Sequence, residues 1–89
     1  MIPSLARRAR LRWDPTRGCH ALLYPEGVLV LNPEAAEVIE RIDGARSVEH
    51  IVDALCEAHP EAPRETLSAD VTELLEQLVA RGFVKMSEP

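Results

Sequence analysis

Short apolar segments separated by turn sequences occupy the first third of the chain, and longer helical patterns follow. Leu11 and Trp13 lie two positions apart among charged residues, as on one face of a half-buried strand. Two further apolar segments, flanked by turns rich in proline and glycine, are too short for helices. The pattern predicts an antiparallel meander with Cys19–Tyr24 in the middle and with Leu11–Asp14 and Val28–Leu31 as its edges.

A helix is expected directly after the third strand. Asn32 can cap it through its side-chain oxygen, Pro33 suits the first helical position, and Glu34 meets the positive end of the helix dipole. Asp43 and Gly44 are expected to end it. The apolar residues spaced along one face of this helix are Ala35, Val38, Ile39 and Ile42.

Two more helices are predicted. The first begins after Ser47, a favourable cap, and ends near His59, before Pro60. Its buried face consists of Val48, Ile51, Val52 and Leu55. The second is the longest and begins near Pro63 or Arg64. Its apolar face consists of Leu67, Val71, Leu74, Leu75 and Leu78.

The end of the longest helix carries a termination signal. Gly82 follows Arg81 and can adopt the left-handed conformation, which places Phe83 where it can contact Leu78, as in a Schellman motif. The segment from Phe83 to Met86 is expected to be a short strand or an irregular tail.

The element order gives the fold class. Met1–Ala9 shows no periodicity, so we expect a flexible tail at 1–9, a single domain at 10–86 and a C-terminal tail at 87–89. Three strands followed by three helices indicate an α+β fold, similar to a winged helix-turn-helix whose sheet comes first.

Charge is distributed unevenly over the 89 residues, whose formal net charge is −5. Residues 1–20 hold five arginines against Asp14, a balance of +4, and the remainder carries −9. The basic start can bind anions, or it can lie as a solvated segment near the acidic body. The overall negative charge disfavours non-specific binding to nucleic acid.

The sequence offers no clear site for catalysis or metal binding. It has no glycine-rich phosphate loop, no Gly-x-Ser-x-Gly and no favourable acid–histidine arrangement, so we expect no enzymatic activity and no cofactor. Cys56 and His59 would share a helix face, but Cys19 and His20 are adjacent and would point to opposite faces of a strand. We therefore expect no metal.

The cytoplasm is the expected location. No apolar run reaches the roughly 18 residues that a membrane-spanning helix needs, and the start of the chain lacks the layout of a secretory signal. Cys19 and Cys56 alone do not indicate a disulfide framework.

The third predicted strand is the most informative segment. Because alternate residues face opposite sides, the four apolar residues of Val28–Leu31 make both faces apolar. Between two layers such a strand is ordinary core. At a sheet edge it is unusual, since edges are commonly protected by charge, proline or bulges. An apolar edge can accept an incoming peptide as an added strand.

A winged-helix DNA-binding regulator is the alternative function. The longest helix would enter the major groove, and such helices normally present Arg, Lys, Asn or Gln. Residues 64–81 instead contain two arginines against Glu65, Asp70, Glu73 and Glu76, a net charge of −2. Repulsion from phosphate disfavours this alternative.

Several short motifs follow one another at a characteristic spacing. They are Arg10-x-Arg12-x-Asp14, Leu23-x-Pro25-Glu26, Leu31-Asn32-x-x-Ala35-x-x-Ile39, Asp43-Gly44, and Ile51 with Leu55. Together they resemble the pyrroloquinoline quinone (PQQ) biosynthesis protein D family over about residues 10–85. Many relatives have a cysteine where this chain has Ile42, so no functional thiol is expected there.

The resemblance implies a non-catalytic peptide chaperone, which is a recognition element for ribosomally made, post-translationally modified peptides. Such proteins bind the precursor peptide of PQQ and present it to a radical S-adenosylmethionine (SAM) enzyme, which joins a glutamate to a tyrosine. In related domains the peptide lies as an added strand between the third strand and the third helix. The peptide-binding residues implied here are Val28, Leu29, Val30, Leu31, Leu67, Val71, Leu74, Leu75 and Leu78.

Two further partners follow as expectations. The arginine-rich start is a candidate contact for the radical SAM enzyme. The apolar edge can also pair with a second copy of the chain or exchange a strand with it, which would give a homodimer.

Overall fold

The structure is a computed structural model that describes residues 1–88. Its strands are β1 (Ile2–Leu5), β2 (Arg10–Asp14), β3 (Cys19–Tyr24), β4 (Gly27–Val30) and β5 (Val84–Ser87). Its helices are α1 (Pro33–Glu40), α2 (Val48–Ala58) and α3 (Arg64–Ala80). The three strands and three helices of the predicted α+β fold are thereby confirmed. The structure also contains a second strand pair, formed by β1 and β5.

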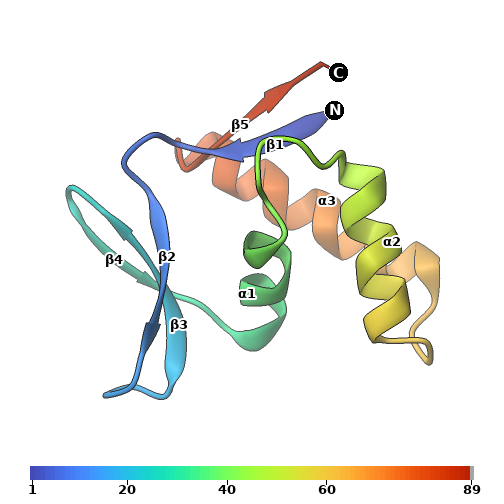
Figure 1. The fold of residues 1–89 in the computed structure, drawn as a ribbon, viewed down its shortest axis with the longest axis horizontal. Coiled ribbons are helices and arrows are strands. Elements are labelled where there is room, and N and C mark those ends of the chain that lie inside the picture. Colours follow the sequence, from blue (N-terminus) through green and yellow to red (C-terminus); the bar gives the residue numbers. More distant parts are fainter. Residues whose placement is uncertain (89) are drawn as a thin grey trace.

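The strands form two separate antiparallel groups (Figure 1). β3 lies between β2 and β4, as predicted, and its partners are in continuous register from Arg10↔Leu23 to Asp14↔Cys19 and from Ala21↔Val30 to Tyr24↔Gly27. β1 pairs with β5 as a two-stranded ribbon beside α3. α1 lies between the three-stranded sheet and α2, so it separates the sheet from the other helices.

The ends of the helices follow local chemistry. The Asn32 side chain accepts a hydrogen bond from the Ala35 amide at 2.8 Å, and Pro33 begins α1, which confirms the predicted cap. Ser47 caps α2 in the same way through the His50 amide at 3.1 Å.

The Schellman motif at the end of α3 is also confirmed. The Phe83 amide donates to the Leu78 carbonyl at 2.9 Å and the Gly82 amide to Val79 at 3.0 Å, with Gly82 at φ +81°. The chain therefore turns sharply after Arg81 and enters β5.

The predicted stop of the first helix was wrong. α1 ends at Glu40, with Arg41 as its C-cap, so Ile42 is buried just outside the helix. Asp43 instead organises the following loop, because its carboxylate accepts the Ala45 and Arg46 amides at 2.9 and 2.8 Å. In the sequence, an aspartate that accepts hydrogen bonds from loop amides looks the same as one that ends a helix, which explains the wrong prediction.

The expected flexible tail at 1–9 was also wrong. Residues 2–5 form β1, which pairs with β5 from Ile2↔Ser87 to Leu5↔Val84, and the Pro3 side chain is fully buried. Pro3 can lie in this ribbon because strands outside a central sheet position tolerate a missing amide donor. Of the expected tail at 87–89, Ser87 ends β5, and Pro89 lies outside the described residues.

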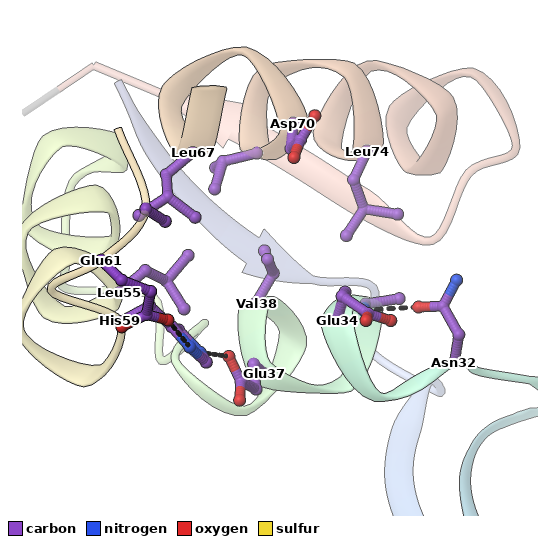
Figure 2. A pocket seen from close by; sticks show the side chains of 13 residues that line it. Asn32, Glu34, Glu37, Val38, Leu55, His59, Glu61, Leu67, Asp70 and Leu74 are labelled. Atoms are coloured by element: carbon purple, nitrogen blue, oxygen red, sulfur yellow. Dashed lines mark hydrogen bonds and ion pairs between the residues drawn. The ribbon is translucent and has the colours of Figure 1, made fainter. Parts of the chain in front are cut away.

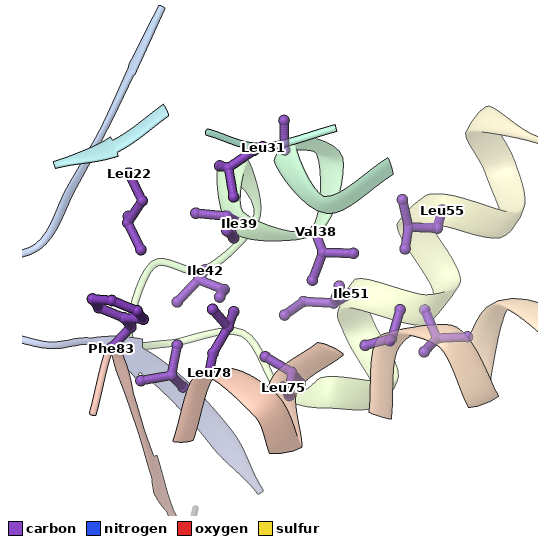
Figure 3. Packing of buried hydrophobic residues seen from close by; sticks show 14 residues of the cluster. Leu22, Leu31, Val38, Ile39, Ile42, Ile51, Leu55, Leu75, Leu78 and Phe83 are labelled. Carbon is purple, nitrogen blue, oxygen red and sulfur yellow. The ribbon is translucent and has the colours of Figure 1, made fainter. Parts of the chain in front are cut away.

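An aliphatic core joins the layers (Figure 3). Leu22 from β3, Ile39 from α1 and Ile51 from α2 are almost completely buried and point into one cluster with Leu75 from α3. Phe83 closes one side of the cluster. The core therefore holds α1 against the sheet on one side and against α2 and α3 on the other.

Replacing Asn32 by Ala should lower the free energy of unfolding by about 1 kcal/mol, because it removes the acceptor for the Ala35 amide. Urea titration would measure the loss, and Asn32→Asp, which keeps a capping oxygen, is the matched control. A loss well below ~0.5 kcal/mol for Asn32→Ala would show that the side chain does not act as the cap.

Candidate functional site

β4 is an open edge of the three-stranded sheet. The Leu31 amide donates to the His20 carbonyl at 3.0 Å, so the backbone of Leu31 faces β3. Orientation alternates along an antiparallel strand, which turns the Leu29 backbone toward β3 and the N–H and C=O groups of Val28 and Val30 away from it. The edge thus presents two residues whose backbone groups are available to another strand.

The side chains of this edge are divided between two faces. Val28 and Val30 are 48% and 52% exposed, whereas Leu29 is half-buried and Leu31 is buried at the end of the strand. The edge carries no charged residue from Gly27 to Val30. At the opposite edge, Arg10 and Arg12 of β2 are exposed.

A pocket of about 380 Å³ begins at Asn32, two residues after β4, and runs between α1 and α3 (Figure 2). Leu67 and Leu74 point into it from α3, Val38 lies opposite on α1, and Leu55 closes one end from α2. Ala35, Val71 and Ala62 complete its apolar surface. The pocket is small, near the lower limit of ordinary ligand pockets.

Carboxylates surround the apolar floor of this pocket. Glu34 and Glu37 come from α1, Glu61 from the α2–α3 loop and Asp70 from α3. His59 Nε2 lies 2.6 Å from a Glu37 oxygen, and this contact ties the end of α2 to α1.

The same contact shifts the protonation of His59. The hydrogen bond to Glu37 and then the charge of Glu37 raise the pKa of His59 above its ordinary value of 6.5. The Glu61 carboxylate, 3.7 Å from Nδ1, also raises this pKa, whereas desolvation and the charge of Arg41 lower it.

The structure divides the nine residues that the resemblance implied for peptide binding. Leu67, Val71 and Leu74 line the pocket, but Leu75 and Leu78 are buried in the core. None of Val28, Leu29, Val30 and Leu31 lines it. Strand and helix therefore contribute to two adjoining surfaces, the β4 edge and the pocket, and a role for these residues in binding stays a prediction.

Sequence reasoning missed the part that α1 takes in the site. Asn32, Ala35 and Val38 form one wall of the pocket, so α1 faces the apolar side of α3 across it. The signal was present in the amphipathic pattern of α1, whose face is broad enough to serve both the core and a pocket.

Residues 1–88 contain no group of three or more His, Cys, Asp or Glu side chains arranged to hold a metal ion. The helices of this described part include none with the length and apolar character required to cross a membrane.

A family model described as Coenzyme PQQ synthesis protein D (PqqD) matches residues 19–84. This chain belongs to the PqqD family. The PqqA binding protein of Azotobacter vinelandii is 42% identical over 85 residues, which cover 96% of this chain and 90% of that protein. The PqqA binding protein of Rahnella aquatilis is 34% identical over 87 residues, which cover 98% and 90%.

Solved PqqD structures have the same fold. The PqqD truncation of Methylobacterium extorquens PqqCD, described as a stand-alone recognition element for ribosomally made and modified peptides, superimposes with a TM-score of 0.82 at 30% identity. That match covers 96% of this chain and 89% of the other. PqqD from Xanthomonas campestris gives 0.61 at 31% identity, covering 97% and 94%.

TbiB1, solved in complex with the TbiA(beta) leader peptide, gives a TM-score of 0.79 at 17% identity, with coverage of 97% and 99%. This likeness shows a shared fold. The expected fold class and the family resemblance are both confirmed.

The His59–Glu37 pair predicts a pH-dependent contribution to stability. Because the folded pKa of His59 is raised, the contribution is fully present below about pH 6.5 and is lost as pH rises through the folded pKa. NMR titration of His59 should give a pKa above 6.5 that returns toward 6.5 in Glu37→Gln. Urea titrations across this window should show a smaller pH-dependent loss of stability in His59→Gln than in the wild type. An unchanged His59 pKa in Glu37→Gln would contradict the assignment.

Proposed function

We propose that this PqqD protein is a non-catalytic peptide chaperone. It binds the precursor peptide of PQQ, PqqA, as a strand added to β4, and it presents the peptide to the radical SAM enzyme of the pathway. The observation that carries the proposal is the β4 edge, where Val28 and Val30 direct backbone groups outward and half of each side chain is exposed. The names of the relatives as PqqA binding proteins support the choice of peptide.

Strand addition suits this edge physically. A peptide paired with Val28 and Val30 gains backbone hydrogen bonds, which are independent of its sequence, and side-chain contacts then provide selectivity. The same strand leads through Leu31 to Asn32, where the apolar pocket begins. One peptide can therefore contact both surfaces in succession.

The surface of α3 argues against the DNA-binding alternative. Glu65, Glu73 and Glu76 line a shallow acidic depression on this helix. The Arg64 guanidinium is held by Asp53 at 2.7 Å on the neighbouring helix. A phosphate backbone approaching this face would meet unfavourable charge.

Two parts of the proposal concern partners of the complex. The candidate contact for the radical SAM enzyme is the set of exposed arginines at 7, 8, 10 and 12. These arginines make the start of the chain basic, whereas the helices are acidic. A homodimer formed through β4 would compete with the peptide for the same backbone groups. The expected location of the protein and of its peptide is the cytoplasm.

Isothermal titration should show saturable binding of PqqA to the wild-type protein, with or without the radical SAM enzyme present. Binding should be much weaker for a peptide of the same composition in scrambled order, which loses the side-chain contacts that give selectivity. If PqqA does not bind under either condition, the proposed function is wrong. Tight binding of duplex DNA that weakens steeply with salt would favour the alternative.

A pair of proline variants tests strand addition itself. Val30→Pro removes an outward amide and should weaken PqqA binding at least about tenfold while leaving the fold largely intact. Leu29→Pro removes an amide that faces β3 and should instead lower the stability by about 2 kcal/mol or more. Isothermal titration and urea unfolding measure the two effects.

Val30→Thr is the matched control, because it keeps the backbone donor and the shape of the side chain and should weaken binding only modestly. If both proline variants fold and bind PqqA normally, the peptide does not pair with β4.

A further inference from the structure

The three-stranded sheet has an inner face that packs on the core and an outer face that the rest of the described chain leaves uncovered. Leu22 of β3 is fully buried in the core, and its cross-strand partners Leu11 and Leu29 share that inner face. Because side chains alternate along a strand, the residues between them point to the outer face. Figure 1 shows α1 on one side of the sheet, and no helix of residues 1–88 lies over the other side.

Two rows of side chains make up the outer face. Each row has an arginine on β2, an apolar residue on β3 and a valine on β4: Arg10, Leu23 and Val28 in one, and Arg12, Ala21 and Val30 in the next. The arginines and valines are exposed, Leu23 is partly buried, and the small Ala21 is buried at the centre. An apolar strip along β3 and β4 is therefore bordered by positive charge along β2.

The positive charge of this face is not neutralised within the sheet. Asp14 is the only acidic residue of β2, β3 and β4, and the turn after β2 occupies its carboxylate. That carboxylate accepts the Thr16 and Arg17 amides at 3.0 and 3.3 Å and lies 3.3 Å from the Arg17 guanidinium. The outer face is thus basic in a chain whose formal net charge is −5.

A peptide added to β4 would extend the same face. In the proposed complex, the peptide pairs with the outward backbone groups of Val28 and Val30. Residues that lie opposite each other in a strand pair have their side chains on the same face of the sheet. The peptide residues paired with these two valines therefore lengthen both rows, and the outer face of the complex consists partly of peptide and partly of protein.

This arrangement limits what can cover the outer face. A partner seated on it contacts the bound peptide and the two arginines at once, which is what an enzyme needs in order to receive the peptide from its chaperone. A symmetric dimer through this face would instead enclose the four arginines of two copies without a free carboxylate to pair with them. The complementary surface is apolar with carboxylates along one side.

We infer that the outer face is the docking surface for the modifying enzyme, which meets Arg10 and Arg12 with carboxylates and covers the apolar strip and the bound peptide together. The inference rests on the proposed function and narrows its basic contact from four arginines to two. Arg7 and Arg8 lie in the turn before β2, outside both rows.

Arginine variants test the contact by isothermal titration of the radical SAM enzyme into PqqA-saturated protein. The Arg10→Gln, Arg12→Gln double variant should bind the enzyme about tenfold more weakly in about 50 mM NaCl, and the difference should shrink in about 300 mM because salt screens charge pairs. The Arg7→Gln, Arg8→Gln double variant removes the same charge outside the rows and should change the affinity less than about twofold. PqqA should bind both variants as it binds the wild type, which also shows that they are folded.

Two adjacent leucines of β3 give a second measurement that leaves the sequence unchanged. Leu23 lies on the outer face and Leu22 on the inner face, so Leu22 is the matched control. Methyl cross-saturation from the enzyme to PqqA-saturated protein should reach Leu23 and spare Leu22. An absence of transfer to Leu23 would place the enzyme on another surface and overturn the inference.

The remaining outcomes separate this inference from the proposed function. Suppose that PqqA binds and the enzyme is recruited, but the Arg10→Gln, Arg12→Gln variant recruits it normally or no worse than the Arg7→Gln, Arg8→Gln variant does. The inference is then overturned and the proposed function stands. No binding of PqqA to the wild-type protein overturns both. A dimer in sedimentation that the first variant disrupts, with its enzyme affinity unchanged, would assign the outer face to a second copy and overturn the inference.

Discussion

The packing of α1 between the sheet and the other helices is the constraint on which the rest of the structure depends. Only two residues separate β4 from α1: Leu31 is buried, Asn32 caps the helix, and Pro33 begins it. The Leu31 amide is bonded to His20 of β3 on one side of this junction, and Ile39 is buried on the other. The junction therefore fixes the position of the β4 edge relative to α1.

This junction explains why the two candidate surfaces adjoin. α3 uses one apolar face for two purposes, because Val71 and Leu75 are buried while Leu67 and Leu74 are only partly buried and line the pocket. The pocket lies between this face and α1, whose lining residues run from Asn32 to Val38. The Asn32 cap therefore lies at the end of α1 that borders the pocket.

Local signals in the sequence predicted most of the fold, but they did not predict the pairing of strands that lie far apart in the sequence. The Asn32 cap and the Schellman motif at Gly82 depend on a few neighbouring residues, so both could be predicted. β1 could not be predicted, since its short proline-containing segment forms a strand only by pairing with β5, some 80 residues later. For the site, the sequence predicted the apolar character of β4 and α3. It did not predict which of their residues the core would take, because the pattern of a helix face does not distinguish core from pocket.

The two edges of the three-stranded sheet are protected differently, and the difference bears on function. Exposed edges invite pairing with other chains, and charged side chains are a common protection. β2 has Arg10 and Arg12 in that role, whereas β4 has the half-exposed Val28 and Val30. A small domain buries a limited share of its surface on folding, and an unprotected apolar edge then favours association. In the proposed complex, a bound peptide strand would satisfy the outward backbone groups of β4 and cover both valines, so the edge that favours unwanted association in the free protein would be the edge that binds the peptide.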